Sequence, residues 1–205
     1  MRSLGSEGTI GHADSFVEGH ALLVFEETGY GPAFAGLLQY DRLRPLGAGT
    51  PDEGHRATLG RLSLDEAFAH TPIVDSDMAR CCLSAVWLLH DFLDESHTIS
   101  QGIETRSGSF WHGIMHRREG DFSNAKYWFR RVDHHPVYER LAAATNALGE
   151  EDFLVAGDWD PFRFVDLCQA AVKGNGSVVA SCQKIQQLEW ELLFDHCYAA
   201  AICRR

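Results

Sequence analysis

Two stretches of the chain carry histidines and carboxylates at helical spacing. In each stretch three such residues lie at positions i, i+4 and i+7: His90, Asp94 and His97 in the first, and His112, His116 and Glu119 in the second. At about 100° per residue, each triplet falls within an arc of roughly 60° on a helix. Each helix would therefore present a stripe of side chains that can bind a metal ion. Imidazole and carboxylate ligands suit Zn, Fe or Mn better than Ca.

A short loop joins the two helices, so we expect them to be antiparallel neighbours whose stripes face each other and hold one or two divalent metal ions. The predicted metal ligands are four histidines and one aspartate: His90, Asp94, His97, His112 and His116. Glu119 or Asp94 would act as a catalytic general base or as a further ligand. The alternative is that these residues form a solvated polar face, because the first triplet lies away from the apolar side of its helix.

The second triplet lies within residues 109–132, SFWHGIMHRREGDFSNAKYWFRRV, a stretch rich in arginine and aromatic residues. Guanidinium groups hold carboxylates and phosphates, and aromatic rings can form the wall of a pocket. The predicted substrate-binding residues are arginines and tryptophans: Arg117, Arg118, Arg130, Arg131, Trp111 and Trp128. With a metal-bound water as nucleophile, this set predicts a hydrolase that acts on a small anionic substrate.

A non-enzymatic interpretation of the same stretch stays open. The aromatic residues would then belong to the core, and the arginines would pair with the nearby carboxylates of Asp121, Asp133 and Glu139. The helices would dock a protein partner or a second copy of the chain. The two interpretations differ in geometry, because an enzyme requires the predicted ligands to converge around a concavity, whereas an interaction module leaves them scattered over the surface.

Composition limits the class of protein. The chain has 205 residues, of which 45% are hydrophobic and 23% charged, and its net charge is -11. These values predict one globular domain and argue against nucleic acid as a partner, because nucleic-acid binders spread lysine and arginine over a face. No apolar run is long enough for a signal peptide or a membrane span. The six cysteines include no CxxC pair, which predicts buried thiols and a cytoplasmic protein.

The hydrophobic periodicity is helical almost throughout, which predicts an all-α fold, a single-domain bundle of about seven helices. The clearest predicted helices cover residues 13–27, 63–69, 76–97, 109–119, 161–172 and 178–202, with a further helix that starts after Asp121 or Ser123. Capping signals support several of them, including Ser63 with Glu66 and Asp160 before Pro161. Residues 43–55, LRPLGAGTPDEGH, predict a Gly/Pro-rich loop inside the domain.

Residues 109–132 form a predicted helical hairpin that resembles a tetratricopeptide unit. The matching small and apolar positions are Gly113, Gly120, Asp121, Phe122, Ala125, Phe129 and Val132. The resemblance covers about one repeat of 34 residues, whereas a solenoid needs three or more copies. It implies helical-hairpin packing and, as the alternative function, a tetratricopeptide-like protein-interaction module.

Two further resemblances bear on function. His90 and Asp91, preceded by Trp-Leu-Leu, resemble the neighbouring His and Asp ligands of all-helical metal phosphohydrolases, in which His55 would stand for an upstream histidine ligand. In the C-terminal half, SHTISQ at 96–101, residues 109–132, WDPFRFVDLC at 159–168 and EWELLFDHCY at 189–198 are similar to hallmark stretches of a family of uncharacterised bacterial proteins with fungal relatives. The second resemblance implies no activity and transfers no catalytic residue.

Overall fold

The structure, a computed structural model, describes residues 25–174 and 176–202, so most of the predicted helix over 13–27 lies outside the described residues. The described part contains ten α-helices, more than the seven predicted, and the all-α class is confirmed. The helices are α1 (Pro32–Leu38), α2 (Glu53–Arg61), α3 (Leu64–Ala67), α4 (Ser76–Leu89), α5 (Leu93–Ser100), α6 (Arg106–Glu119), α7 (Phe122–Val132), α8 (Val137–Ala147), α9 (Pro161–Val172) and α10 (Val179–Ala201).

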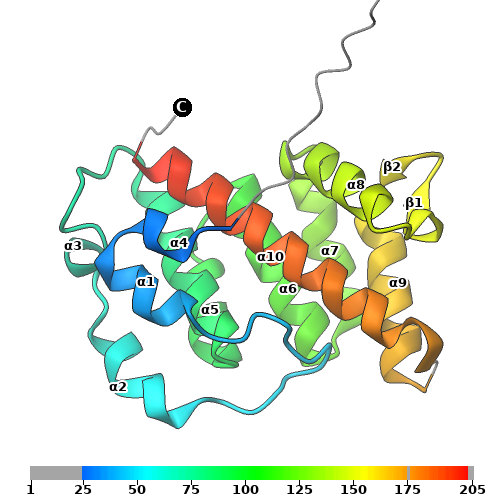
Figure 1. Ribbon diagram of the computed structural model, residues 1–205, viewed down its shortest axis with the longest axis horizontal. Coiled ribbons are helices and arrows are strands. Elements are labelled where there is room, and N and C mark those ends of the chain that lie inside the picture. Colours follow the sequence, from blue (N-terminus) through cyan, green and yellow to red (C-terminus); the bar gives the residue numbers. More distant parts are fainter. Residues whose placement is uncertain (1–24, 175, 203–205) are drawn as a thin grey trace, which may run out of the picture.

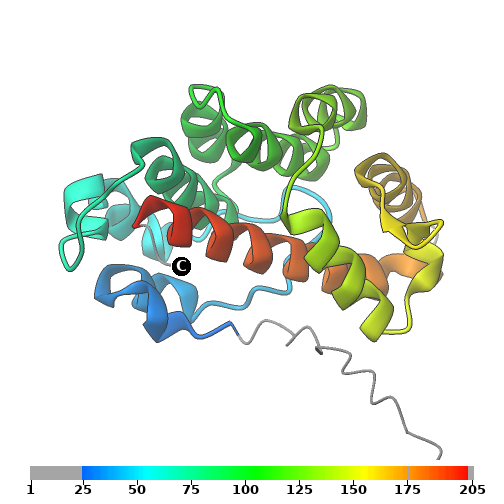
Figure 2. The same ribbon diagram turned by 90° about the horizontal axis from the view of Figure 1, so that it is seen from above.

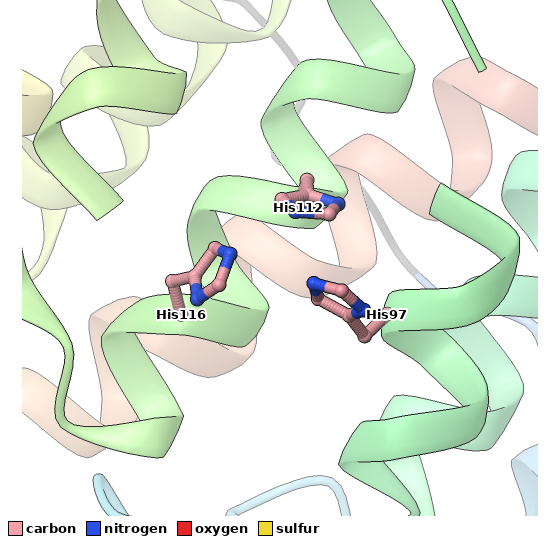
Figure 3. Close-up of side chains that lie close together, drawn as sticks. All are labelled: His97, His112 and His116. Atoms are coloured by element: carbon pink, nitrogen blue, oxygen red, sulfur yellow. The ribbon is translucent and has the colours of Figure 1, made fainter. Parts of the chain in front are cut away.

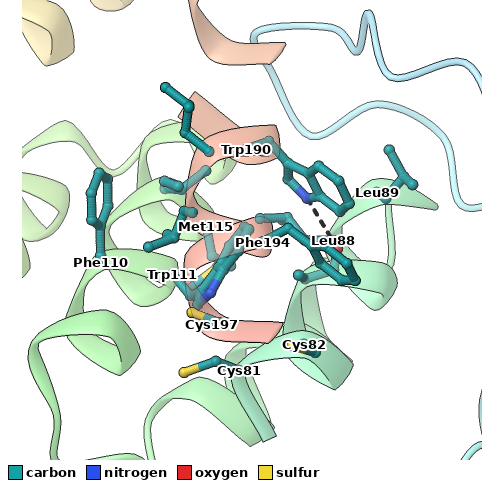
Figure 4. Close-up of a cluster of buried hydrophobic side chains, with 14 of the residues drawn as sticks. Cys81, Cys82, Leu88, Leu89, Phe110, Trp111, Met115, Trp190, Phe194 and Cys197 are labelled. Carbon is teal, nitrogen blue, oxygen red and sulfur yellow. Dashed lines mark hydrogen bonds between the residues drawn. The ribbon is translucent and has the colours of Figure 1, made fainter. Parts of the chain in front are cut away.

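The long helix α10 runs across the molecule and packs against α4, α8 and α9 (Figure 1). Seen from above, it lies between α1 on one side and the α6–α7 hairpin on the other (Figure 2). Its buried face carries Trp190, Phe194 and Cys197, which contact side chains of α4 and α6 (Figure 4). The indole Nε1 of Trp190 donates to the carbonyl of Ala85 at 3.2 Å. None of the helices in the described part of the chain is long and apolar enough to cross a membrane.

Local signals for helix ends are confirmed. Ser63 and Glu66 form the predicted capping box of α3, in which the Glu66 amide donates to Ser63 Oγ at 3.2 Å. Asp160 caps α9 through the amides of its first turn, and Pro161 takes the first helical position. Gly120 ends α6 in the left-handed conformation at φ 93°. These ends depend on residues that are close in sequence, which is why the pattern predicts them.

The prediction of one helix over 76–97 is wrong, because the chain breaks between α4 and α5. Asp91 adopts a left-handed conformation at φ 65°, which interrupts the helix. Its carboxylate is fully buried and forms ion pairs with Arg44 and Arg118. Since an unpaired buried charge is costly, these two arginines favour the break that aims Asp91 at them.

The predicted loop over 43–55 is shorter than expected, because α2 begins at Glu53 with Asp52 as its N-cap. The amide of Thr50 donates to Asp91 Oδ2 at 3.1 Å, which ties the loop to the break between α4 and α5. Gly49 lies so close to the Asp91 carboxylate, at φ 75°, that a Cβ atom would collide with it. The buried aspartate therefore holds the loop in place.

Helix α6 is the central element of the hairpin. It begins one turn earlier than predicted, with Thr105 rather than Ser109 as the cap, and every residue from Ser107 to Arg118 is buried. Its close contact with α7 depends on Gly113, because a Cβ atom there would lie 3.1 Å from the Phe129 ring. The hairpin is thus present, with α6 buried and α7 exposing one face to solvent.

Two small features complete the fold. Strands β1 (Leu154–Val155) and β2 (Asp158–Trp159), which the sequence pattern does not indicate, form a hairpin whose turn has positive φ angles at Ala156 and Gly157. The five cysteines in the described residues are free and buried, as predicted: Cys81, Cys82, Cys168, Cys182 and Cys197. Cys203 lies outside the described residues.

Candidate metal centres

Three of the five predicted metal ligands lie together, and we call His97, His112 and His116 the three-histidine cluster. One nitrogen of each ring lies within 4.8 Å of the corresponding nitrogens of the other two. The ring centroids are 4.6 Å apart for His97 and His112, 4.7 Å for His112 and His116, and 5.3 Å for His97 and His116. Figure 3 shows the rings converging from α5 and α6.

The spacing of the cluster suits a transition metal after a small adjustment. Ligand nitrogens around a tetrahedral zinc ion, with bonds of about 2.0–2.1 Å, stand about 3.4 Å apart. The ligand nitrogens of the cluster lie within 4.8 Å of one another, so binding a metal requires them to approach by about 1.4 Å at most. Three histidines with a fourth position left for water is the ligand set of a catalytic zinc site.

Ser100 sets the tautomer of His112. The hydroxyl of Ser100 donates to the carbonyl of His97 at 3.3 Å, so its oxygen is available to accept from Nδ1 of His112, 2.9 Å away. A proton on Nδ1 leaves the lone pair of a neutral imidazole on Nε2. Outer hydrogen bonds of this kind orient metal-binding histidines.

Glu119 and Asn124 hold the ring of His116. Nδ1 of His116 donates to Glu119 Oε2 at 3.0 Å, because a carboxylate only accepts. Nε2 then carries the lone pair and accepts from the side-chain amide of Asn124 at 3.0 Å. A metal bound to Nε2 would replace the Asn124 contact. Glu119, predicted as a general base or ligand, thus contacts His116 and lies where it can orient that ring.

Burial keeps two of the three imidazoles neutral. It lowers the pKa of His112 to about 3, and the charges of His116 and His97 act in the same direction. Burial also lowers the pKa of His116, although Glu119 opposes that shift. Metal ions bind the neutral form of histidine, so at neutral pH neither ring has to lose a proton first.

Two predicted substrate-binding residues lie beside the cluster. The ring of Trp128 is 4.0 Å from the ring of His112, and the guanidinium of Arg131 lies 5.2 Å from the Trp128 ring. Arg130, the next predicted residue, has its guanidinium 5.8 Å from the ring of Phe162 on α9. Of the two neighbouring arginines, Arg131 is therefore the one placed near the cluster.

The other three predicted substrate-binding residues belong to the interior. Arg117 is fully buried and pairs with Glu189 of α10, and Arg118 is buried against Asp91. Trp111 is fully buried and packs edge-on against a tryptophan of α10. All three side chains are part of the core, and contact between them and a substrate stays a prediction. The arginines are ion-pair partners, as the alternative expected, although with other carboxylates.

His90 and Asp94 do not join the cluster, because the break after α4 separates their faces. Asp94 is exposed on α5 near Trp87 and belongs to neither metal-ligand group found in the described residues. His90 lies in a second group with Asp52 and His55, whose ligand atoms are also within 4.8 Å of one another. The resemblance to metal phosphohydrolases was the only sequence signal for His55, and it expected Asp91 rather than Asp52 beside the histidines.

Neither the protein-family models, the curated proteins nor the solved structures compared with this chain include a significant match to it.

Proposed function

We propose that this protein is a metal-dependent hydrolase that acts on a small anionic substrate, with its metal in the three-histidine cluster. The convergence of His97, His112 and His116 carries the proposal, since one nitrogen of each lies within 4.8 Å of the others. The hydrogen bonds that Nδ1 of His112 and Nδ1 of His116 donate to Ser100 and Glu119 support it, because both leave Nε2 as the basic nitrogen of the ring. Zn, Fe and Mn all suit three imidazoles.

A divalent metal held by these three histidines would activate water as a nucleophile at neutral pH. The protein contributes orientation and charge. Ser100 and Glu119 orient two of the ligands, and Arg131 supplies a cation on the Trp128 side of the cluster. A cation in that position favours a substrate that carries a carboxylate or phosphate.

Metal content tests the proposal directly. Protein purified without an affinity tag or chelator should contain metal at this site, measured by mass spectrometry of the dissolved sample, and the double variant His112→Ala/His116→Ala should lose one equivalent. The matched control is His134→Ala, because the side chain of His134 is 94% exposed and lies beside Asp133 rather than beside the cluster. If the double variant keeps the metal content of the wild type, the site is not at these residues.

Activity gives the second test. With p-nitrophenyl phosphate and p-nitrophenyl acetate as probes, the metal-loaded protein should release p-nitrophenol, and His112→Ala/His116→Ala should not. Arg131→Ala should raise KM for the anionic probe with little change in kcat, whereas Arg130→Ala, which changes the neighbouring arginine, should leave KM unchanged. Loaded protein that turns over neither probe and no other phosphate or carboxylate ester would overturn the hydrolase assignment.

A further inference from the structure

A buried lone pair on His90 has no partner. The side chain of His90 is fully buried, and its Nε2 lies 3.1 Å from the carbonyl oxygen of Leu37. A carbonyl only accepts, so Nε2 carries the proton and Nδ1 of the neutral ring carries the lone pair. Among the described residues Nδ1 has no hydrogen-bond partner. A buried acceptor without a partner is destabilising, so a bound group that this nitrogen could contact would stabilise the site.

A second acceptor lies near this nitrogen. Oδ2 of Asp52 lies 3.7 Å from Nδ1 of His90, so a carboxylate oxygen faces a nitrogen lone pair with no proton between them. A cation placed between two such groups would satisfy both. The distance is also larger than a direct hydrogen bond allows. The pair therefore has the chemistry of two metal ligands.

His55 supplies a third ligand. Its ring centroid is 4.5 Å from that of His90, and its Nδ1 donates to Asp52 Oδ2 at 2.6 Å, which leaves the lone pair on Nε2. One ligand atom from each of His55, His90 and Asp52 lies within 4.8 Å of the other two. Two imidazoles and one carboxylate form a ligand set typical of zinc and non-haem iron sites.

The surroundings hold these ligands in place. The amide of Asp52 donates to the carbonyl of His90 at 3.1 Å, which joins the start of α2 to the end of α4. The ring of Tyr40 packs 4.3 Å from the ring of His90 and 5.8 Å from the ring of His55. Asp91, next to His90, anchors the loop before Asp52 through Arg44 and the Thr50 amide. The site is thus built by three separate segments.

We propose that Asp52, His55 and His90 form a second metal site, independent of the three-histidine cluster, for a divalent transition metal such as Zn²⁺, Fe²⁺ or Mn²⁺. The site shares no ligand with the cluster, so either can exist without the other. The negative charge of Asp52 offsets part of the charge of the ion, and the partial exposure of His55 and Asp52 leaves a route by which metal and water can enter.

The test is a titration of metal-free protein with Zn²⁺, followed by calorimetry, in a His112→Ala/His116→Ala background that lacks the cluster. One equivalent should bind. Adding Asp52→Asn/His55→Ala should abolish it, and both substitutions lie at partly exposed positions that leave the core intact. Asn at position 52 retains the helix cap, because Asn and Asp cap equally well. Asp75→Asn, which changes the capping aspartate of α4, is the matched control and should leave the equivalent unchanged.

The outcomes separate this proposal from the hydrolase. If the background variant binds no Zn²⁺, Co²⁺ or Mn²⁺, or if Asp52→Asn/His55→Ala keeps the bound equivalent, the second site is refuted. If wild-type protein binds one equivalent that only Asp52→Asn/His55→Ala removes, the second site stands and the three-histidine cluster fails. Circular dichroism of each variant shows whether a loss of binding reflects unfolding.

Discussion

Ser100 Oγ lies 2.9 Å from Nδ1 of His112, and this hydrogen bond holds the imidazole ring of one member of the three-histidine cluster. Both residues are buried, so water does not readily replace the contact. The serine is the last residue of α5, and the histidine lies in the middle of α6. The geometry of the proposed metal site therefore depends on how these two helices pack.

Ser100→Ala should weaken metal binding at the three-histidine cluster by about 10–100-fold, because an imidazole without its outer hydrogen bond is less basic and less well oriented. Competition with a chromophoric chelator measures the affinity. The matched control is Ser84→Ala, which removes a buried serine that bonds to Ser96, at 2.9 Å, and touches no proposed ligand. Equal affinities for the two variants would contradict a role for Ser100 in orienting His112.

The buried ion pair between Arg117 and Glu189 predicts a specific pattern of stabilities. Glu189→Gln should lower the free energy of unfolding by about 3–5 kcal/mol, because it leaves the arginine charge buried and unpaired. Arg117→Met combined with Glu189→Leu should be more stable than Glu189→Gln alone, since no buried charge remains and an unsatisfied Nε is removed. Urea denaturation measures the free energy of unfolding of the wild type and of both variants. A double variant less stable than Glu189→Gln would contradict the view that the unpaired buried charge is what destabilises the single variant.

Gly113→Ala should destabilise the protein by about 1 kcal/mol. The added methyl group would lie 3.1 Å from the buried Phe129 ring, and overpacking of about 1–3 kcal/mol exceeds the gain in helix propensity of about 1 kcal/mol. Gly60→Ala is the matched control, because nothing lies within 4 Å of its Cβ position in α2. That variant should gain about 0.5–1 kcal/mol. Thermal unfolding distinguishes the two, and a stabilised Gly113→Ala would contradict the close packing of α6 on α7.

Stability should fall as the pH drops below about 6.5, partly because of His135. Burial lowers the pKa of His135 to about 3, and the charges of His196 and Arg106 act in the same direction. Between that value and the ordinary pKa near 6.5, the unfolded chain binds a proton that the folded protein does not, so acid favours unfolding. One such group lowers the free energy of unfolding by up to about 1.4 kcal/mol for each pH unit of acidification.

The measurement is the free energy of unfolding of His135→Gln and wild type between pH 6.5 and pH 5, where carboxylates stay ionised. The variant should show the shallower slope. His134→Gln provides the control, because the exposed side chain of His134 has no such burial and its slope should match the wild type. Identical slopes for all three proteins would mean that His135 takes up its proton in the folded state as readily as in the unfolded chain.

Sequence alone was sufficient for several features that depend on neighbouring residues. Helical periodicity predicted the all-α class, and the short loop between two histidine-bearing helices predicted that they would pack together. The capping box at Ser63 and the left-handed end at Gly120 are set by interactions within one turn, so a local pattern contains the whole cause.

Tertiary structure decided the rest. The break at Asp91 depends on Arg44 and Arg118, which lie 47 and 27 residues away, so nothing next to Asp91 shows that the helix must stop there. The same break separates His90 from the helix face that carries His97. The loop that Asp91 anchors brings Asp52 and His55 close to His90. Packing also pairs Arg117 with Glu189 and Arg118 with Asp91, carboxylates that lie far from these arginines in the sequence. A helical pattern indicates which residues share a face, but only packing determines what that face contacts and whether it reaches solvent.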